Sequence, residues 1–334
     1  MLELVTWAAL ALSALVVSTL AVRRLAVAAG ERRRLAAEAR LRPGALALVA
    51  GDTGTPLNLT THDAAVLVGL LDRYRSRIRG ASADRITEFF EQRGVIDREL
   101  RALASRRAWR RATAAFSLGS MGAGRAAPAL IDALQDRNRN VRVSAARSLG
   151  NLAAVGAVEP LVLAFARRSI PQLVAGQALL SIGKASLPAL RRLASDPDPE
   201  ARAFALELIG LAGDAEDASH VLPHLRDGSA EVRAKAARAL GRLGAENATA
   251  ELAAALYDRI GFVRAVVARS LGAVGDRRAL PALLDVARHD EFAAAQAAAW
   301  AAARLDPRAV VVAAATDGAG AHLVEAATLT AVRR

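Results

Sequence analysis

The sequence contains few side chains whose types and spacing would allow them to bind a metal ion. Of its five histidines, only His220 and His224 have metal-ligand spacing, four residues apart on a predicted helix. Pro223 lies between them, and no acidic residue completes the His-Glu-x-x-His pattern of zinc enzymes. The chain has no cysteine, which excludes disulfides and cysteine-based zinc sites. We therefore expect no metal site.

Two short motifs resemble catalytic or phosphate-binding loops but lack residues that the chemistry needs. Asp52-Thr53-Gly54 follows an apolar run, as in aspartic proteases, but that mechanism needs a second carboxylate in an all-β setting, and the motif has no second copy. The lysine that follows the aspartate in P-type ATPases is also missing. The glycine-rich stretch 119–124 follows a predicted helix and lacks a phosphate-binding lysine. Both stretches are interpreted as turns, and we expect neither catalysis nor a bound cofactor.

A series of arginines offers the clearest candidate for binding. Each lies six residues after an aspartate, and the series is Arg142, Arg202, Arg233 and Arg264. The wider column of short acceptors, each expected to cap the following helix, is Ser105, Asp136, Ser169, Asp196, Asp227 and Asp258. The arginines could line a groove for an acidic segment of a partner, or they could reach neighbouring carboxylates and carbonyls in a structural ladder. The repetition favours the ladder.

These arginines belong to a repeat. The stretch Val232–Gly244 returns at Val141 and Val263, and looser copies start at Arg110, Val174, Ala201 and Ala293. Small and apolar residues recur at helical spacing inside each copy, and six copies carry a glycine in one column, which suggests close backbone contact or a helix end. A second apolar helical run, often with proline near its start, precedes each copy. Self-similarity at about 30 residues predicts stacked helix pairs.

The pattern Asp-x4-Val-Arg-x-x-Ala-Ala-Arg-x-Leu-Gly-x-Leu, seen best at 227–243 and 136–152, resembles HEAT repeats. It is similar to the short bacterial kind first named for phycobilisome-lyase proteins. The resemblance covers about residues 108–315 and implies an all-α solenoid of about seven helical hairpins that acts as a binding scaffold. It also implies that the Asp and Arg columns form a ladder between repeats. The third copy departs from the pattern with Ala175, and the seventh, having lost Asp, Arg and Gly, is expected to cap the stack.

Composition agrees with stacked helices. Of 334 residues, 53% are hydrophobic but only 4% are aromatic, so the core must be built from alanine, leucine and valine. The net charge is +12. Residues 4–22 contain no charge and are long enough to span a bilayer, which predicts one transmembrane helix within an anchor at 1–24. Five arginines follow between 23 and 34, so the positive-inside rule places the N-terminus outside and the rest at the cytoplasmic face of the membrane.

The region 25–107 is predicted to be basic and juxtamembrane, ahead of a solenoid at 108–334 that ends in a capping helix. Pro43 and Gly44 predict a helix break and a short extended excursion over 43–60. Helices follow, and twelve arginines lie between residues 73 and 111. We expect these to form a membrane-proximal surface for anionic lipid or an acidic partner, with its end at Arg106, Arg107, Arg110 and Arg111. Nucleic acid is the alternative, but interleaved aromatic residues are few.

The sequence therefore predicts a non-catalytic, membrane-anchored adaptor that binds a protein partner, a membrane enzyme or its cytoplasmic domain. The likeness to bacterial membrane-anchored HEAT proteins implies a polysaccharide-synthesis glycosyltransferase as one such partner. Two rivals stay open at this point. One is an enzyme-related role, by likeness to phycobilin lyase subunits or HEAT-like DNA glycosylases. The other is nucleic-acid binding through residues 73–111.

Overall fold

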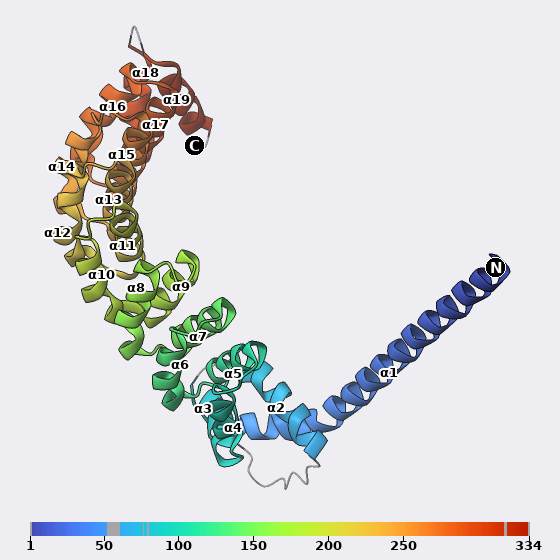
Figure 1. Cartoon of the computed structure of the whole chain (residues 1–334). Helices are drawn as coiled ribbons and strands as arrows, with labels where there is room; N and C mark the ends of the chain where they lie inside the picture. The colour runs from blue at the N-terminus through green and yellow to red at the C-terminus, as the bar shows by residue number, and fades with distance from the viewer. Residues whose placement is uncertain (1, 52–60, 76, 79, 317–318, 333–334) are drawn as a thin grey trace. The chain divides into compact units, whose positions relative to one another are not determined.

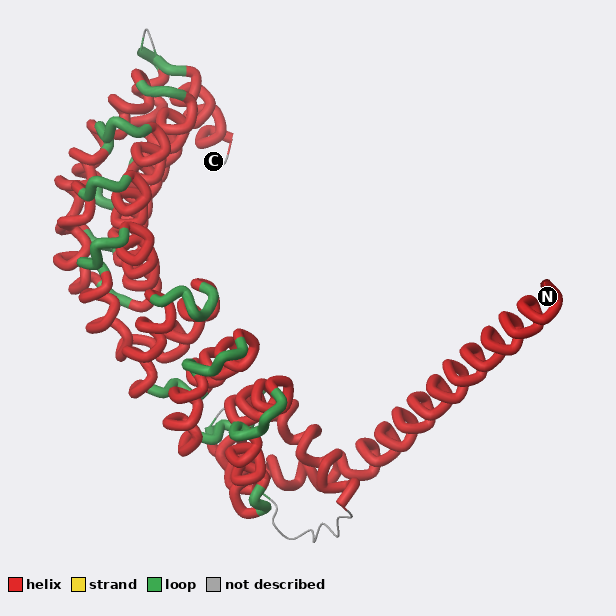
Figure 2. Tube along the Cα trace, viewed as in Figure 1, coloured by secondary structure: helices red, strands yellow, loops and turns green. Residues whose placement is uncertain are grey.

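The computed structural model describes residues 2–51, 61–75, 77–78, 80–316 and 319–332 (Figure 1). Every regular element in these ranges is helical (Figure 2), which confirms the all-α prediction. The chain divides into two compact units, each described here by itself. Unit 1 comprises residues 1–105 and 117–123, and unit 2 comprises residues 106–116 and 124–334.

Unit 1 is a small cluster of helices around an apolar core. Its helices are α1 (Leu2–Ala50), α2 (Thr61–Arg75), α3 (Ala81–Gln92) and α4 (Val95–Ala102). Leu67 and Leu71 of α2 and Ile86 and Phe90 of α3 are fully buried, because each helix turns one apolar face inward. The C-terminal part of α1 joins them through Leu41 and Ala45, which are also buried.

The helix break predicted at Pro43 is wrong. Helix α1 continues through Pro43 and Gly44 to Ala50 and ends at Gly51, whose φ is +96°. A proline inside a helix costs about 3 kcal/mol, but the burial of Leu41 and Ala45 on either side offsets that cost. Arg85 of α3 also donates to the Val49 carbonyl, one of the carbonyls that a helix end leaves unpaired. The rest of the predicted excursion, residues 52–60, lies outside the described residues.

The described side chains in the N-terminal part of α1 lie at the surface. All described residues from 18 to 36 are exposed, and burial begins only at Ala37. In Figure 1 this part of the helix extends beyond α2, α3 and α4. The predicted transmembrane segment 4–22 is thus helical, but the side chains of residues 1–17 lie outside those described, so its membrane role stays a prediction.

Unit 2 consists of helix pairs stacked in two rows (Figure 1). Helix α5 (Ala108–Ser120) belongs to unit 2 as far as residue 116. The long row then contains α7 (Arg139–Asn151), α9 (Gln172–Ile182), α11 (Pro199–Ala212), α13 (Ala230–Leu243), α15 (Gly261–Val274) and α17 (Phe292–Leu305). The short row contains α6 (Ala127–Ala133), α8 (Val158–Ala166), α10 (Leu187–Leu193), α12 (Ala218–Val221), α14 (Thr249–Ala255) and α16 (Leu280–His289). The last helices are α18 (Pro307–Ala314) and α19 (Ala321–Val332).

The glycine column lets neighbouring long helices approach closely. A Cβ on Gly210 would lie 2.7 Å from the Cα of Ala239, and one on Gly241 would lie 2.9 Å from the Cα of Ser270. Real Cβ atoms are not found that close to a neighbour's backbone, so each position needs glycine. Gly150 makes the same close approach to α9. The predicted close backbone contact is therefore confirmed at these positions.

The junction between α9 and α11 is built differently. Gly183 ends α9 with a φ of +78°, and an added Cβ there would meet nothing within 4 Å. Instead, the Phe204 ring lies within contact distance of Gly176 and stacks on Phe165, with ring centroids 4.0 Å apart. Aromatic packing replaces the close helix approach at this junction.

Among the residues whose side chains the structure describes, which leaves out 1–17, one stretch is long and apolar enough to cross a membrane. It is Gln172–Leu193. It comprises α9, the 3-10 turn at Gly183–Ser186 and α10, and half of it is buried inside the protein. The apolar character of this stretch is accounted for by its place in the core of the third repeat.

Candidate functional site

The aspartates of the repeat hold the turn between each short helix and the next long helix. The Asp227 carboxylate accepts from the main-chain N–H of Ser229 at 2.8 Å, and Asp136 accepts from Asn138 at the same distance. These aspartates lie ahead of the helix, so the prediction that they cap it is wrong. The caps are two residues further on: the Asp198 side chain, for example, accepts from the N–H of Glu200 at 2.9 Å.

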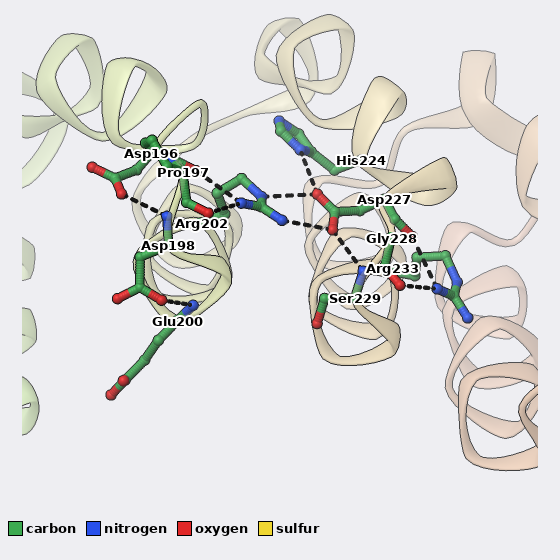
Figure 3. Close-up of polar contacts among 10 residues, drawn as sticks. All are labelled: Asp196, Pro197, Asp198, Glu200, Arg202, His224, Asp227, Gly228, Ser229 and Arg233. Atoms are coloured by element: carbon green, nitrogen blue, oxygen red, sulfur yellow. Dashed lines mark hydrogen bonds and ion pairs between the residues drawn. The ribbon is translucent and has the colours of Figure 1, made fainter.

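Four of the turn aspartates, Asp136, Asp227, Asp258 and Asp290, also bind an arginine of the preceding repeat. Arg202 makes two hydrogen bonds to Asp227, both of 2.8 Å, and a further 2.8 Å bond to the carbonyl of Asp196 (Figure 3). Arg233 binds Asp258 at 2.6 and 2.9 Å in the same way. Two parallel N–H···O bonds to a carboxylate give strong, directional pairing. We call each such arginine–aspartate pair between repeats a rung of the ladder.

The rungs are shielded from water and held in their charged form. The Arg233 and Asp258 side chains are only 8% and 10% exposed. The Arg202 guanidinium holds the pKa of Asp227 below its usual value, and Arg111 does the same for Asp136. Burial opposes both shifts, so it is the hydrogen bonds to arginine that keep these carboxylates ionised.

The ladder places the predicted site residues in two groups. Arg202, Arg233 and Arg264 are closed in rungs with Asp227, Asp258 and Asp290, so they are not free to line a groove for a partner. Arg142 differs: its Nε donates to the Ser169 carbonyl at 2.8 Å and its Nη1 to the Asp136 carbonyl at 2.8 Å. Serine replaces aspartate at residue 169, so Arg142 has no carboxylate partner among the described residues.

The prediction that Arg111 lies on the basic membrane-proximal surface is wrong. Its guanidinium binds Asp136 at 2.7 and 2.8 Å, and its side chain is 9% exposed, so it is the first arginine of the ladder and not part of an open basic surface. Arg106 and Arg107 are exposed, and Arg110 is partly exposed. The signal for Arg111 was available in the 25-residue separation from Asp136, which equals that between Arg202 and Asp227. Asp290, the partner of Arg264, was also missed, because the seventh copy departs from the pattern.

The long row presents a second set of charged residues at its surface. Glu207 of α11 accepts from Lys235 at 3.0 Å and from Arg242 at 2.6 Å, both on α13. These cations lower the pKa of Glu207 even though burial acts to raise it. Arg238, also on α13, is half exposed and lies 3.8 Å from Glu207, whereas Arg269 on α15 is exposed with no ion-pair partner among the described residues. The helices of the long row also expose large apolar side chains, with Leu211 of α11 50% and Phe262 of α15 49% exposed.

Several cavities lie in unit 2. One of about 540 Å³ opens between the long helices beside Phe116, Arg147 and Gln177. Two others lie at equivalent places between consecutive short helices. One, of about 710 Å³, contains the closed pair Arg233 and Asp258. The other, of about 680 Å³, contains Arg142 and Ser169.

No group of residues in the described ranges has the geometry of a metal centre. Nowhere in them do three histidine, aspartate or glutamate side chains gather so that they could hold a metal ion. His224 lies 4.0 Å from Asp227, and burial lowers its pKa. It therefore belongs to the surroundings of a rung.

Comparison with known proteins identifies the class. The sequence model described as HEAT repeats matches residues 98–183 and 218–304, more than half of the chain. The chain belongs to the HEAT-repeat family. No curated protein sequence matches it.

Solved structures with a similar fold include that of human deoxyhypusine hydroxylase in complex with glycerol, 24% identical, covering 81% of this chain and 98% of that chain with a TM-score of 0.34. The Escherichia coli protein YibA is 17% identical, covering 75% of this chain and 98% of its own, with a TM-score of 0.41. An engineered protein is 18% identical, covering 86% and 82%, with a TM-score of 0.38. Likenesses of this size carry no information on activity or partner.

Proposed function

We propose that this HEAT-repeat protein is a non-catalytic scaffold that is anchored in a membrane by the start of α1 and binds a protein partner at the cytoplasmic face. The observation that carries the proposal is the surface of the long row. There, helices α11, α13 and α15 expose Leu211, Arg238, Phe262 and Arg269. Arginine and aromatic side chains such as Phe262 are enriched in protein interfaces.

The shape of α1 supports the anchor. At 1.5 Å per residue, the stretch 2–36 that precedes the first buried residue is roughly 50 Å long. About 30 Å of helix crosses the hydrocarbon core of a bilayer, so a basic segment of about 20 Å would remain between the membrane and the rest of unit 1. Arg23, Arg24 and Arg32 lie on this segment, and all three are exposed. Anionic headgroups attract such residues.

A tether of this kind favours a partner that also resides in the membrane. Two proteins held in one bilayer meet at a high effective concentration, so a modest interface is sufficient for stable association. The partner we propose is a membrane enzyme or its cytoplasmic domain, with a polysaccharide-synthesis glycosyltransferase as one example.

The test is affinity purification of the full-length protein from its own cells in mild detergent, followed by mass spectrometry. We expect one membrane protein in stoichiometric amount. The double variant Arg238→Glu, Arg269→Glu should lose it, whereas Arg308→Glu, an exposed position on α18, should retain it. Recovery of the protein alone, or with nucleic acid that a nuclease removes, would contradict the proposal.

A further inference from the structure

Two equivalent cavities of unit 2 differ in the residue that faces the arginine of the ladder. In the cavity of about 710 Å³, the Asp258 carboxylate occupies the donors of Arg233. In the cavity of about 680 Å³, Arg142 stands where Arg233 does, and Ser169 stands where Asp258 does. The Ser169 hydroxyl donates to the Ala164 carbonyl at 2.9 Å, in its own turn. We call the pair Arg142 and Ser169 the open rung.

The open rung leaves one end of the arginine without a protein partner. The Nε and Nη1 groups of Arg142 are used by main-chain carbonyls. Its Nη2 group, which binds the aspartate in the closed rungs, donates to no described residue. A guanidinium offers two parallel donors to a carboxylate, and Arg142, with its Nη2 group unused, lines a cavity of the size that ligands occupy.

The charges around this cavity favour an anion. Arg137 and Arg167 also line it, are exposed, and have no ion-pair partner among the described residues. Its acidic residue Glu159 is paired with Arg192 outside the lining. Asp136 is held by Arg111. The unneutralised charge of the cavity is therefore positive.

We propose that the open rung binds an aspartate or glutamate side chain from an acidic segment of a partner protein. That carboxylate would accept from the Nη2 group of Arg142, the group whose counterpart in the closed rung donates to Asp258. The inference rests on the proposed scaffold function and names the chemistry of what the scaffold recognises.

The cavity wall argues for a peptide rather than a small free acid. Ile131, Pro160 and Leu163 line it together with the arginines, and Leu163 is 43% exposed. An acetate-sized ligand would leave this apolar surface in water. A peptide with apolar residues beside its acidic ones would bury it and gain free energy from doing so.

The experiment uses the full-length protein in detergent micelles and a fluorescein-labelled peptide of alternating leucine and glutamate, with binding followed by fluorescence anisotropy. Ser169→Asp supplies the missing carboxylate from within the chain. We expect it to weaken peptide binding by about tenfold or more, since the peptide then loses charge-assisted hydrogen bonds to Arg142. Arg142→Gln, which removes the guanidinium, should weaken binding to a similar extent.

Two controls separate the site from general attraction to a basic protein. Ser195→Asp adds the same charge at an exposed turn residue outside the cavity and should bind the peptide like the wild type. A peptide with glutamine in place of glutamate should not bind, and acetate should not displace the acidic peptide. Equal binding by the wild type and Ser169→Asp, or no binding by the wild type, would overturn the inference.

The same variants separate this inference from the proposed function. If Ser169→Asp purifies with the membrane partner as well as the wild type does, the scaffold proposal stands and the open rung is not its binding site. If no protein purifies with either form, the scaffold proposal fails, and the peptide measurement still decides what the open rung binds.

Discussion

The guanidinium of Arg233 lies 2.6 and 2.9 Å from the carboxylate of Asp258 in the next repeat. Neither side chain is more than 10% exposed. The pair fastens consecutive helix pairs through the turn between them, and it repeats with Arg111, Arg202 and Arg264.

Removing one member of a rung should destabilise the stack. Arg233→Ala leaves Asp258 charged and largely buried, so we expect the free energy of unfolding to fall by about 3 kcal/mol. Urea denaturation followed by circular dichroism measures the change. The matched control is Arg192→Ala, which breaks an exposed pair with Glu159 and should cost less than about 1 kcal/mol. If both variants lost the same free energy of unfolding, the rung would contribute no more to stability than an exposed ion pair.

The rungs also predict a dependence of stability on pH. Arginine holds the pKa of Asp227, Asp136 and Asp290 below the ordinary value of 3.8. Because the folded pKa is the lower one, this stabilisation is complete above the unfolded pKa and is lost as the pH falls through the folded pKa. We expect the melting temperature to drop below about pH 4. Asp227→Asn should flatten that drop, whereas Asp132→Asn, at an exposed position on α6, should leave it unchanged.

Closing the open rung should stabilise the protein. Ser169→Asp gives Arg142 the partner that its equivalents have, and a hydrogen bond to a charged group contributes about 1.5 kcal/mol or more. The melting temperature should rise by a few degrees. A lower melting temperature would show that the third repeat cannot place a carboxylate as Asp258 is placed.

Overpacking the glycine column should weaken the contact between long helices. Gly241→Leu would put its Cβ 2.9 Å from the Ser270 backbone, so α13 and α15 must separate. We expect a loss of about 1–3 kcal/mol in a thermal melt. Gly69→Ala is the control: an added Cβ on this α2 residue meets nothing within 4 Å, and alanine favours the helix. An unchanged melting curve for Gly241→Leu would contradict the close contact.

Deleting residues 1–24 tests the anchor. The described residues that remain in α1 keep their buried contacts at Ala37, Leu41 and Ala45, so the shortened protein should fold and leave the membrane fraction. Centrifugation of cell extracts and circular dichroism of the soluble fraction measure both points. If the folded protein sedimented with membranes, the basic region or a membrane partner would hold it there.

Most of unit 2 could be predicted from the sequence. Each repeat is a short pair of helices whose small, apolar and glycine positions recur at the spacing of a helix face, so the stack and its columns follow from a local pattern written several times. The same repetition of aspartate and arginine columns predicts the ladder. In unit 1 the local signal failed: Pro43 indicated a break, but burial of its neighbours against α2 and α3 kept α1 helical.

What only the tertiary structure decided is which arginine has no carboxylate partner among the described residues. Arg142, Arg202, Arg233 and Arg264 occupy one column of the sequence and are locally equivalent. Whether each is satisfied depends on the residue that the next repeat places opposite it, aspartate for three of them and Ser169 for Arg142. The state of a hydrogen-bonding group is set by its partners in space, not by its own type or position in the chain.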